Sequence, residues 1–166
     1  MIADAGRPFT AERSELPMLY VLLAPGSIEL LVVHLLVNMA SPIAAWALSA
    51  VTVLGIVQII AIVCRVKRRP TLLTDDGLVI RSAKGFEVAL PWNRIAAVEP
   101  IGFAPAPSGN GVICAALLAH PNIHVAAREA FTVKRVGRLL SARSITLRVD
   151  EPGELVAVAQ HRLERL

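Results

Sequence analysis

The stretch TLLTDDGLVIRSAKGFEVALPWNRI, residues 71–95, decides the fold class because its hydrophobic pattern differs from that of the long apolar run before it. TLLTDDGLVIRSA predicts two short strands around the tight turn TDDG, whose glycine is expected to supply a positive φ, and AKG predicts a second turn. In FEVAL, residues 86–90, apolar side chains alternate with Glu87 and Ala89, which predicts a third strand with one apolar face. RIAAVEPI, which begins after PWN, predicts a fourth strand.

The rest of the C-terminal region predicts further strands and a final helix. GFAPAPSGNG, residues 102–111, has the Pro and Gly content of a loop, and VICAALLAH, AFTVKRV and SITLRV are candidate strands after it. In the last segment, DEPGELVAVAQHRLERL, apolar residues recur at helical spacing and Pro152 suits the first turn of a helix. Several antiparallel strands followed by one helix predict a small curled sheet or barrel that the helix caps.

The region before this stretch is too apolar for an ordinary soluble domain. The whole chain is 55% hydrophobic with a mean hydropathy of +0.60, and between Leu16 and Cys64 the only formally charged residue is Glu29. A helix of about 20 residues crosses the hydrocarbon core of a bilayer, so the apolar region is long enough to cross twice. The turn NMASP, residues 38–42, divides it, because the proline is well placed to begin a second helix.

We therefore expect an α+β membrane protein with a transmembrane helical hairpin followed by a β-rich domain. Lys and Arg flank one end of the hairpin and are absent from the NMASP turn, so both chain ends are expected on the cytoplasmic side of the cell (inner) membrane. The expected boundaries are a polar tail at 1–15, helices at about 16–39 and 42–64, a basic linker at 65–70 and the domain at 71–166. An alternative layout makes residues 14–25 an interfacial segment, with a corner at Pro25-Gly26 and the first span beginning near Ser27.

The order of these parts resembles the bacterial pleckstrin-homology-like (PH-like) domain family of small membrane proteins. The resemblance is carried by the paired-span anchor and by two segments, LLTDDGLVIRSAKGFEVALPWNRIAAVEP (residues 72–100) and SITLRVDEPGELVAVAQHRL (residues 144–163). A strand pair around "tddGl", an apolar strand leading into a "PW" step and a "v.dP.el" junction between strand and helix recur in that family. The resemblance implies an antiparallel PH-like β-barrel with a C-terminal capping helix, which serves as a binding or scaffolding module.

Three polar residues in the predicted spans are candidates for contacts inside the membrane: Glu29, His34 and Gln58. A span that begins near Leu16 places Glu29 close to the bilayer midplane, where a charge costs at least about 2.5 kcal/mol. The acid is therefore expected to be protonated or paired, unless the span sits lower and Glu29 approaches the inner headgroups. Residues five apart are separated by about 140° around a helix. Glu29 and His34 thus share one face poorly, which weakens a proton relay within this chain.

Basic residues form the other candidate surface, for anionic lipid or for a partner protein. One group follows the second predicted span and one lies in the later strands: Arg65, Lys67, Arg68, Arg69, Arg128, Lys134, Arg135 and Arg138. The alternative is that the second group is the solvated face of a sheet. Trp46, near the NMASP turn, is expected as an interfacial anchor. Trp92 is expected either to pack as a corner residue at a sheet edge or to be an anchor that contacts the membrane or a ligand.

Composition and residue spacing argue against several functional classes. Aromatic residues are few and acids nearly balance bases in the C-terminal region, so a nucleic-acid surface is poorly supported. Cys64 and Cys114 lack the spacing of metal or redox pairs. Pro121, between His120 and His124, argues against a metal site on a helix. Signatures of a catalytic triad, phosphate loop, metalloprotease or carboxylate pair are absent from the sequence, so we expect no enzyme activity and no cofactor.

These features predict a non-catalytic accessory subunit. Its hairpin is expected to dock on a larger integral membrane complex and its C-terminal domain to bind a neighbouring subunit. Small residues in SPIAAWALSAVTVLG, residues 41–55, allow the close helix contact that docking needs. The alternative is a membrane-anchored sensor of anionic lipid headgroups. A proton or ion pathway that uses Glu29 is a more remote alternative.

Overall fold

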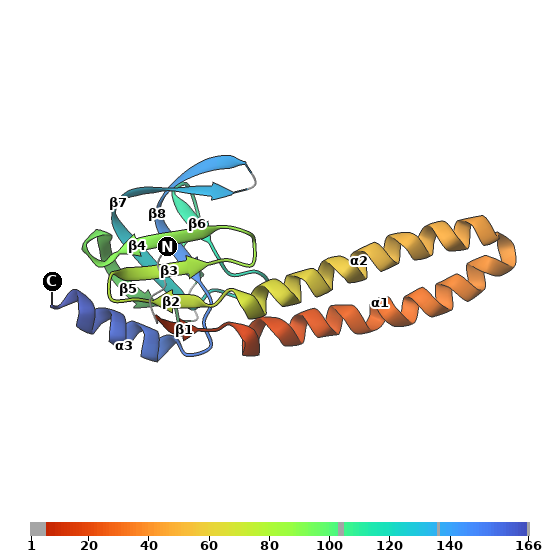
Figure 1. Cartoon of the computed structure of the whole chain (residues 1–166), viewed down its shortest axis with the longest axis horizontal. Coiled ribbons are helices and arrows are strands. Elements are labelled where there is room, and N and C mark those ends of the chain that lie inside the picture. Colours follow the sequence, from red (N-terminus) through yellow and green to blue (C-terminus); the bar gives the residue numbers. More distant parts are fainter. Residues whose placement is uncertain (1–5, 103–104, 136, 166) are drawn as a thin grey trace.

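The computed structural model describes residues 6–102, 105–135 and 137–165, and it shows two long helices that extend from one side of a β-rich body (Figure 1). The architecture confirms the α+β class. In chain order the elements are β1 (Arg7–Phe9), α1 (Glu12–Ala40), α2 (Pro42–Arg68), β2 (Thr71–Leu73), β3 (Gly77–Arg81), β4 (Glu87–Pro91), η1 (Trp92–Arg94), β5 (Ile95–Pro100), β6 (Val112–Cys114), β7 (Ile123–Arg135), β8 (Arg138–Leu147) and α3 (Pro152–Leu163).

The helices α1 and α2 form the expected antiparallel hairpin, and both are long and apolar enough to cross a membrane. The turn between them is a single residue, Ser41, whose side chain accepts a hydrogen bond from the Ala44 N–H and so caps α2. The helix α1 is continuous through Pro17 and Pro25. The corner that the alternative layout expected at Pro25-Gly26 is therefore wrong.

The outer boundaries of the hairpin differ from those expected. The helix α1 begins at Glu12 and α2 continues to Arg68, so most of the expected basic linker is helical. Lys and Arg are good helix formers, and cations are favourable at a helix C-terminus. The helix ends just before Arg69, because the residue preceding a proline disfavours the helical conformation, and Pro70 follows.

The first sheet has the strand order β1-β2-β3-β4, with every neighbouring pair antiparallel. Strands β2 to β4 and the turns between them confirm the pattern read from residues 71–95. The glycine of the TDDG turn, Gly77, is required for a different reason from the one expected: a Cβ there would lie 2.2 Å from the Leu90 carbonyl oxygen, and its φ is not positive. The positive φ falls instead at Gly85, in the AKG turn.

The strand β1 corrects the expectation of a polar tail at residues 1–15. Its backbone pairs with β2, in the register Arg7 with Leu73 and Phe9 with Thr71. Phe9 is buried at 4% exposure and belongs to the hydrophobic core of the C-terminal domain. The segment before α1 is therefore part of the same domain as the segment after α2.

The second sheet has the order β5-β7-β8-β6, in which β6 is parallel to β8 and the other pairs are antiparallel. The candidate strand VICAALLAH is a strand only at Val112–Cys114. Residues 130–135 of AFTVKRV lie in β7, and its last residue, 136, lies outside the described residues. Residues 144–147 of SITLRV lie in β8, which ends before Arg148. The β7–β8 pairing shifts register between Ala126 and Phe131, and this irregularity bends the hairpin. Beyond it, the two strands project from the body (Figure 1).

The two sheets share one core, which α3 covers. Leu155, Val156 and Ala159 of α3 are buried, and the helix contacts β5 and η1. The strand β4 of the first sheet also contacts β7 of the second sheet, so the two sheets are in direct contact. The order of strands followed by a C-terminal helix is as expected, but the strands form two sheets instead of one, and the β6–β8 pair is parallel.

Candidate functional site

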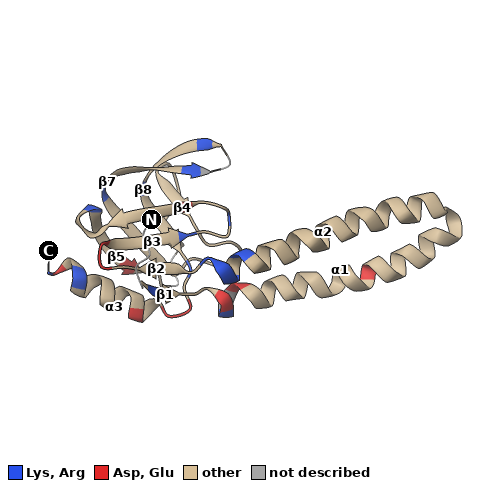
Figure 2. Ribbon diagram, viewed as in Figure 1, with Lys and Arg blue, Asp and Glu red and all other residues tan. Residues whose placement is uncertain are grey.

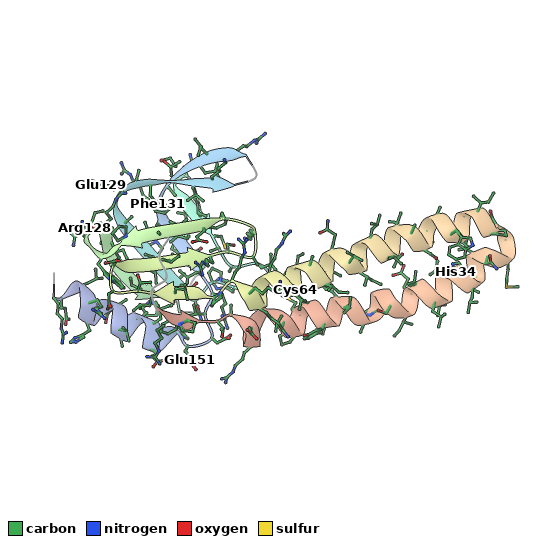
Figure 3. The ribbon with its side chains drawn as sticks, in the orientation of Figure 1. His34, Cys64, Arg128, Glu129, Phe131 and Glu151 are labelled. Carbon is green, nitrogen blue, oxygen red and sulfur yellow. The ribbon has the colours of Figure 1, made fainter. Side chains whose placement is uncertain are left out.

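The two helices of the hairpin are joined by a polar contact near their turn. His34 Nδ1 and Ser49 Oγ share a hydrogen bond of 2.7 Å, and the His34 ring packs edge-on against Trp46 with 5.3 Å between centroids. Figure 3 shows His34 at the end of the hairpin away from the β-domain. Of the predicted intramembrane residues, His34 therefore has a partner on the other helix.

Glu29 and Gln58 differ from His34, because both side chains are exposed. Within the described ranges of the chain, Glu29 forms no hydrogen bond or ion pair, and neither does Gln58. Glu29 and His34 nevertheless line the same cavity between the helices, although they are five residues apart. That cavity measures about 10 Å³, which is at the lower limit for one water molecule.

The base of the hairpin is fixed to the β-domain by a buried acid. Glu15, 2% exposed, lies in the first turn of α1, and its carboxylate accepts hydrogen bonds from two consecutive backbone N–H groups. The donors are Leu117, at 3.0 Å, and Leu118, at 2.9 Å, in the irregular segment after β6. One carboxylate thereby holds this segment of the domain against α1.

Further polar contacts tie the N-terminal segment to the other side of the domain. Asp150 Oδ2 accepts hydrogen bonds from the Thr10 hydroxyl at 3.0 Å and from the Arg13 N–H at 3.1 Å. An acid at the N-terminal end of α1 satisfies free N–H groups and opposes the positive end of the helix dipole. Arg7 forms an ion pair with Glu154 of α3. The hairpin and the domain are thus joined at two places besides the chain itself, by Glu15 and by Asp150.

The predicted basic surface is divided between two ends of the domain (Figure 2). Arg65, Lys67 and Arg68 lie exposed in the last turn of α2, and Arg69 lines a cavity of about 40 Å³ where the hairpin meets the domain. Arg128 lies at the end of the domain away from the helices (Figure 3), and its Nε donates to the Ile95 carbonyl. It therefore does not belong to one surface with the cluster on α2.

The other members of the basic set lie in the projecting part of the β7–β8 hairpin. Lys134 and Arg138 are exposed on its two strands. Arg135 has a described backbone, paired with Arg138, whereas its side chain lies outside the described structure.

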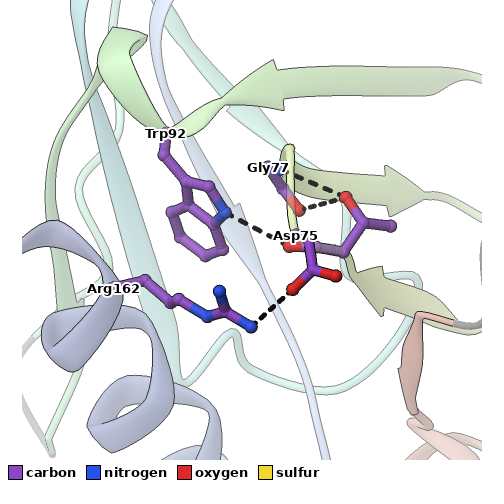
Figure 4. A network of polar contacts seen from close by, with 5 residues as sticks. Asp75, Gly77, Trp92 and Arg162 are labelled. Carbon is purple, nitrogen blue, oxygen red and sulfur yellow. Dashed lines mark hydrogen bonds and ion pairs between the residues drawn. The ribbon is translucent and has the colours of Figure 1, made fainter. Parts of the chain in front are cut away.

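The two tryptophans have opposite environments. Trp46 is 69% exposed near the hairpin turn, where an interfacial anchor is expected. Trp92 is only 5% exposed, and its Nε1 donates to the Thr74 carbonyl at 3.2 Å (Figure 4). Arg162 of α3 pairs with Asp75 in the same turn. Trp92 is therefore a core corner residue, and its expected role as a membrane or ligand anchor is wrong because the ring is covered.

Across residues 6–102, 105–135 and 137–165, no group of three or more His, Cys, Asp or Glu side chains is placed to hold a metal ion. His120 Nδ1 forms a hydrogen bond of 2.8 Å with the carbonyl oxygen of the neighbouring Pro121. The polar groups that stand out are instead an exposed acid on a long apolar hairpin and a buried acid at its base.

Comparison with known proteins adds no family to these observations. No protein family, curated protein or solved structure significantly matches this chain. The function must therefore be argued from the residues themselves.

Sequence reasoning missed Ser49, Glu15 and Asp150. Ser49 could have been found, because it lies about as far beyond the turn as His34 lies before it. Glu15 and Asp150 gave no comparable signal, because their partners are backbone groups and residues distant in sequence.

Proposed function

We propose that this protein is a non-catalytic accessory subunit of a larger integral membrane complex. The hairpin of α1 and α2 crosses the membrane and docks on a partner helix, while the β-domain lies in the cytoplasm and binds the soluble face of a neighbouring subunit. Arg65 to Arg69 at the base of the hairpin support this orientation, because cytoplasmic flanks are rich in Lys and Arg.

The register of the hairpin supports a mid-membrane depth for Glu29. The bond between His34 and Ser49 aligns the two antiparallel helices, so Glu29, five residues farther from the turn than His34, lies opposite about Leu54. With Arg65 at the inner boundary, a span of about 20 residues reaches back to about Ala45. Leu54 is near the middle of that span. This register disfavours the alternative in which Glu29 approaches the inner headgroups.

The observation that carries the proposal is that the Glu29 side chain is exposed and forms no hydrogen bond or ion pair with the described residues. Ionisable groups at that depth face protein or water and pair with other groups, because lipid cannot solvate them. A partner transmembrane helix with a cation or a hydrogen-bonding side chain satisfies Glu29. An ion pathway within this hairpin is less well supported, since the cavity beside Glu29 holds no more than about one water molecule.

The β-domain supports the second half of the proposal. Glu15, Asp150 and the strand β1 fix the domain to the base of the hairpin, so docking of the helices also orients the domain. The order of two sheets and a closing helix supports a PH-like fold, and such modules bind or scaffold.

The test is substitution of Glu29 by Leu in the tagged full-length protein, purified from its native membranes in mild detergent. Buried polar contacts between membrane helices contribute roughly 0.6 to 2 kcal/mol, which corresponds to a loss of about 3- to 30-fold in affinity. We expect Glu29→Leu to lose stoichiometric membrane partners while the protein still inserts.

Ser27→Ala is the matched control. Ser27 is also exposed on α1, but its hydroxyl donates to the Leu23 carbonyl of its own helix, at 3.0 Å. We expect this variant to retain the partners of the unmodified protein. Retention of the same partners in the same ratio by Glu29→Leu would contradict the proposal.

A further inference from the structure

The outer half of the β7–β8 hairpin has two different faces. Phe131 and Val133 point into the core, at 6% and 1% exposure. On the opposite face Lys134 pairs across the strands with Leu139, which is 72% exposed. The turn contains Gly137, whose φ of +77° lets the chain reverse tightly. An exposed leucine therefore lies beside exposed cations at the end of a projecting hairpin.

The end of the β7–β8 hairpin lies on the side of the domain from which α1 and α2 extend. In Figure 1 the closed end of the β7–β8 hairpin points in the direction in which α1 and α2 leave the domain, and it reaches about as far as the base of those helices. Arg128 and Glu129, on the same strand β7, lie at the opposite end of the domain (Figure 3). A bilayer that contains α1 and α2 therefore has its headgroups at the level of the β7–β8 turn.

We infer that the end of the β7–β8 hairpin, defined by Lys134, Arg138 and Leu139, is a second membrane contact that docks on anionic phospholipid headgroups. The inference rests on the proposed insertion of α1 and α2, but it does not depend on the docking of Glu29.

The positive charge of the hairpin end and its exposed apolar side chain both favour anionic phospholipid as the binding partner. The sequence contains no Asp or Glu between Ala130 and Val149, so the cations of the hairpin are not neutralised by neighbours along the chain. Cations close to an anionic leaflet bind it electrostatically, and the exposed Leu139, paired with Lys134 and next to Arg138 in the chain, enters the apolar boundary beneath the headgroups. The basic last turn of α2 approaches the same leaflet, so the hairpin end extends an existing membrane-facing region.

The test uses the purified full-length chain in lipid nanodiscs, with Cys64 and Cys114 replaced by Ser and a single cysteine introduced by Leu139→Cys. A fluorophore on that cysteine is quenched by lipids that carry a spin label at the headgroup. We expect strong quenching in an equal mixture of phosphatidylcholine and phosphatidylglycerol. High salt is expected to reduce it, because salt screens the attraction of exposed charges.

Two further positions separate the possible outcomes. A label at Glu129→Cys, in the same strand at the opposite end of the domain, is expected to remain unquenched. A label at Leu54→Cys is expected to be quenched by acyl-chain spin labels whatever the headgroup, because it reports insertion of α2. Absence of quenching at position 54 would overturn both the insertion and this inference. Absence of quenching at position 139 alone would overturn only this inference.

The charge requirement is tested by Lys134→Glu combined with Arg138→Glu. Both side chains are exposed, so the fold is expected to survive, which the unfolding temperature checks. We expect quenching at position 139 to fall to the level found at position 129. Equal quenching in pure phosphatidylcholine, or no effect of the two substitutions, would overturn the assignment to anionic headgroups.

Discussion

Glu15 is an acid buried at the junction between α1 and the β-domain, and its two backbone partners make a testable prediction. Glu15→Ala leaves the N–H groups of Leu117 and Leu118 without their acceptor, and an unsatisfied buried group costs about 1 to 3 kcal/mol. We expect faster amide hydrogen exchange in residues 115–120 and a free energy of unfolding lower by about that amount.

The control for this prediction is Glu12→Ala. Glu12 is the other acid in the first turn of α1, so it shares the interaction with the helix dipole but forms no hydrogen bond or ion pair with the described residues of the domain. Its removal is expected to leave exchange at residues 115–120 unchanged. Equal exchange in both variants would show that Glu15 does not hold this segment.

Single residues were predictable from the sequence where a local pattern determines their environment. Val88 and Leu90 alternate with exposed neighbours, and the sequence placed them correctly on the buried face of a strand. Trp92 was ambiguous, because an aromatic ring after a proline suits either a core corner or a surface anchor. Only the fold around it, with Thr74 as hydrogen-bond acceptor, decides between the two.

At the scale of elements, the strand β1 makes the clearest prediction, because it precedes the hairpin yet belongs to the domain that follows it. Phe9→Ala removes a buried aromatic ring from the domain core, and such substitutions cost about 3 to 5 kcal/mol. We expect denaturation of the β-domain, followed by fluorescence of the buried Trp92 in a Trp46→Phe background, to shift to lower denaturant concentration.

Pro8→Ala is the control for this effect, because Pro8 is exposed on the same short strand. A large shift for Phe9→Ala with little for Pro8→Ala is expected. A domain whose stability is unaffected by Phe9→Ala would contradict the assignment of β1 to the core.

Elements whose contacts are mainly local in sequence could be predicted, whereas elements that depend on contacts distant in sequence could not. The two helices, the strands of residues 71–95 and α3 each follow from hydrophobic period and turn residues. The strand β1 could not be predicted, because a three-residue strand with one buried side chain has no detectable period, and its pairing crosses the whole hairpin. The parallel pairing of β6 with β8 is likewise set by tertiary structure.

At the scale of the whole molecule, the account depends on a bilayer as the environment of α1 and α2. Side chains such as Leu36 and Leu54 are about two-thirds exposed, at 63% and 66%, and exposed apolar surface of this extent requires a non-aqueous partner. The short Ser41 turn and the antiparallel helices place the strand β1 and the β-domain at the same end of the hairpin. Three proposed roles depend on this placement. They are those of the exposed Glu29, of the Lys and Arg residues at the base of the α1–α2 hairpin, and of the end of the β7–β8 hairpin.

The most direct test of this placement is cysteine labelling in sealed, right-side-out membrane vesicles with a maleimide that cannot cross the membrane. The variants carry Ser41→Cys in the hairpin turn or the native, exposed Cys114 in the β-domain, each as the only cysteine. The account predicts that Ser41→Cys reacts in intact vesicles and that Cys114 reacts only after detergent opens them. Reaction of Cys114 in intact vesicles, or release of the protein from the membrane by alkaline carbonate, would contradict it.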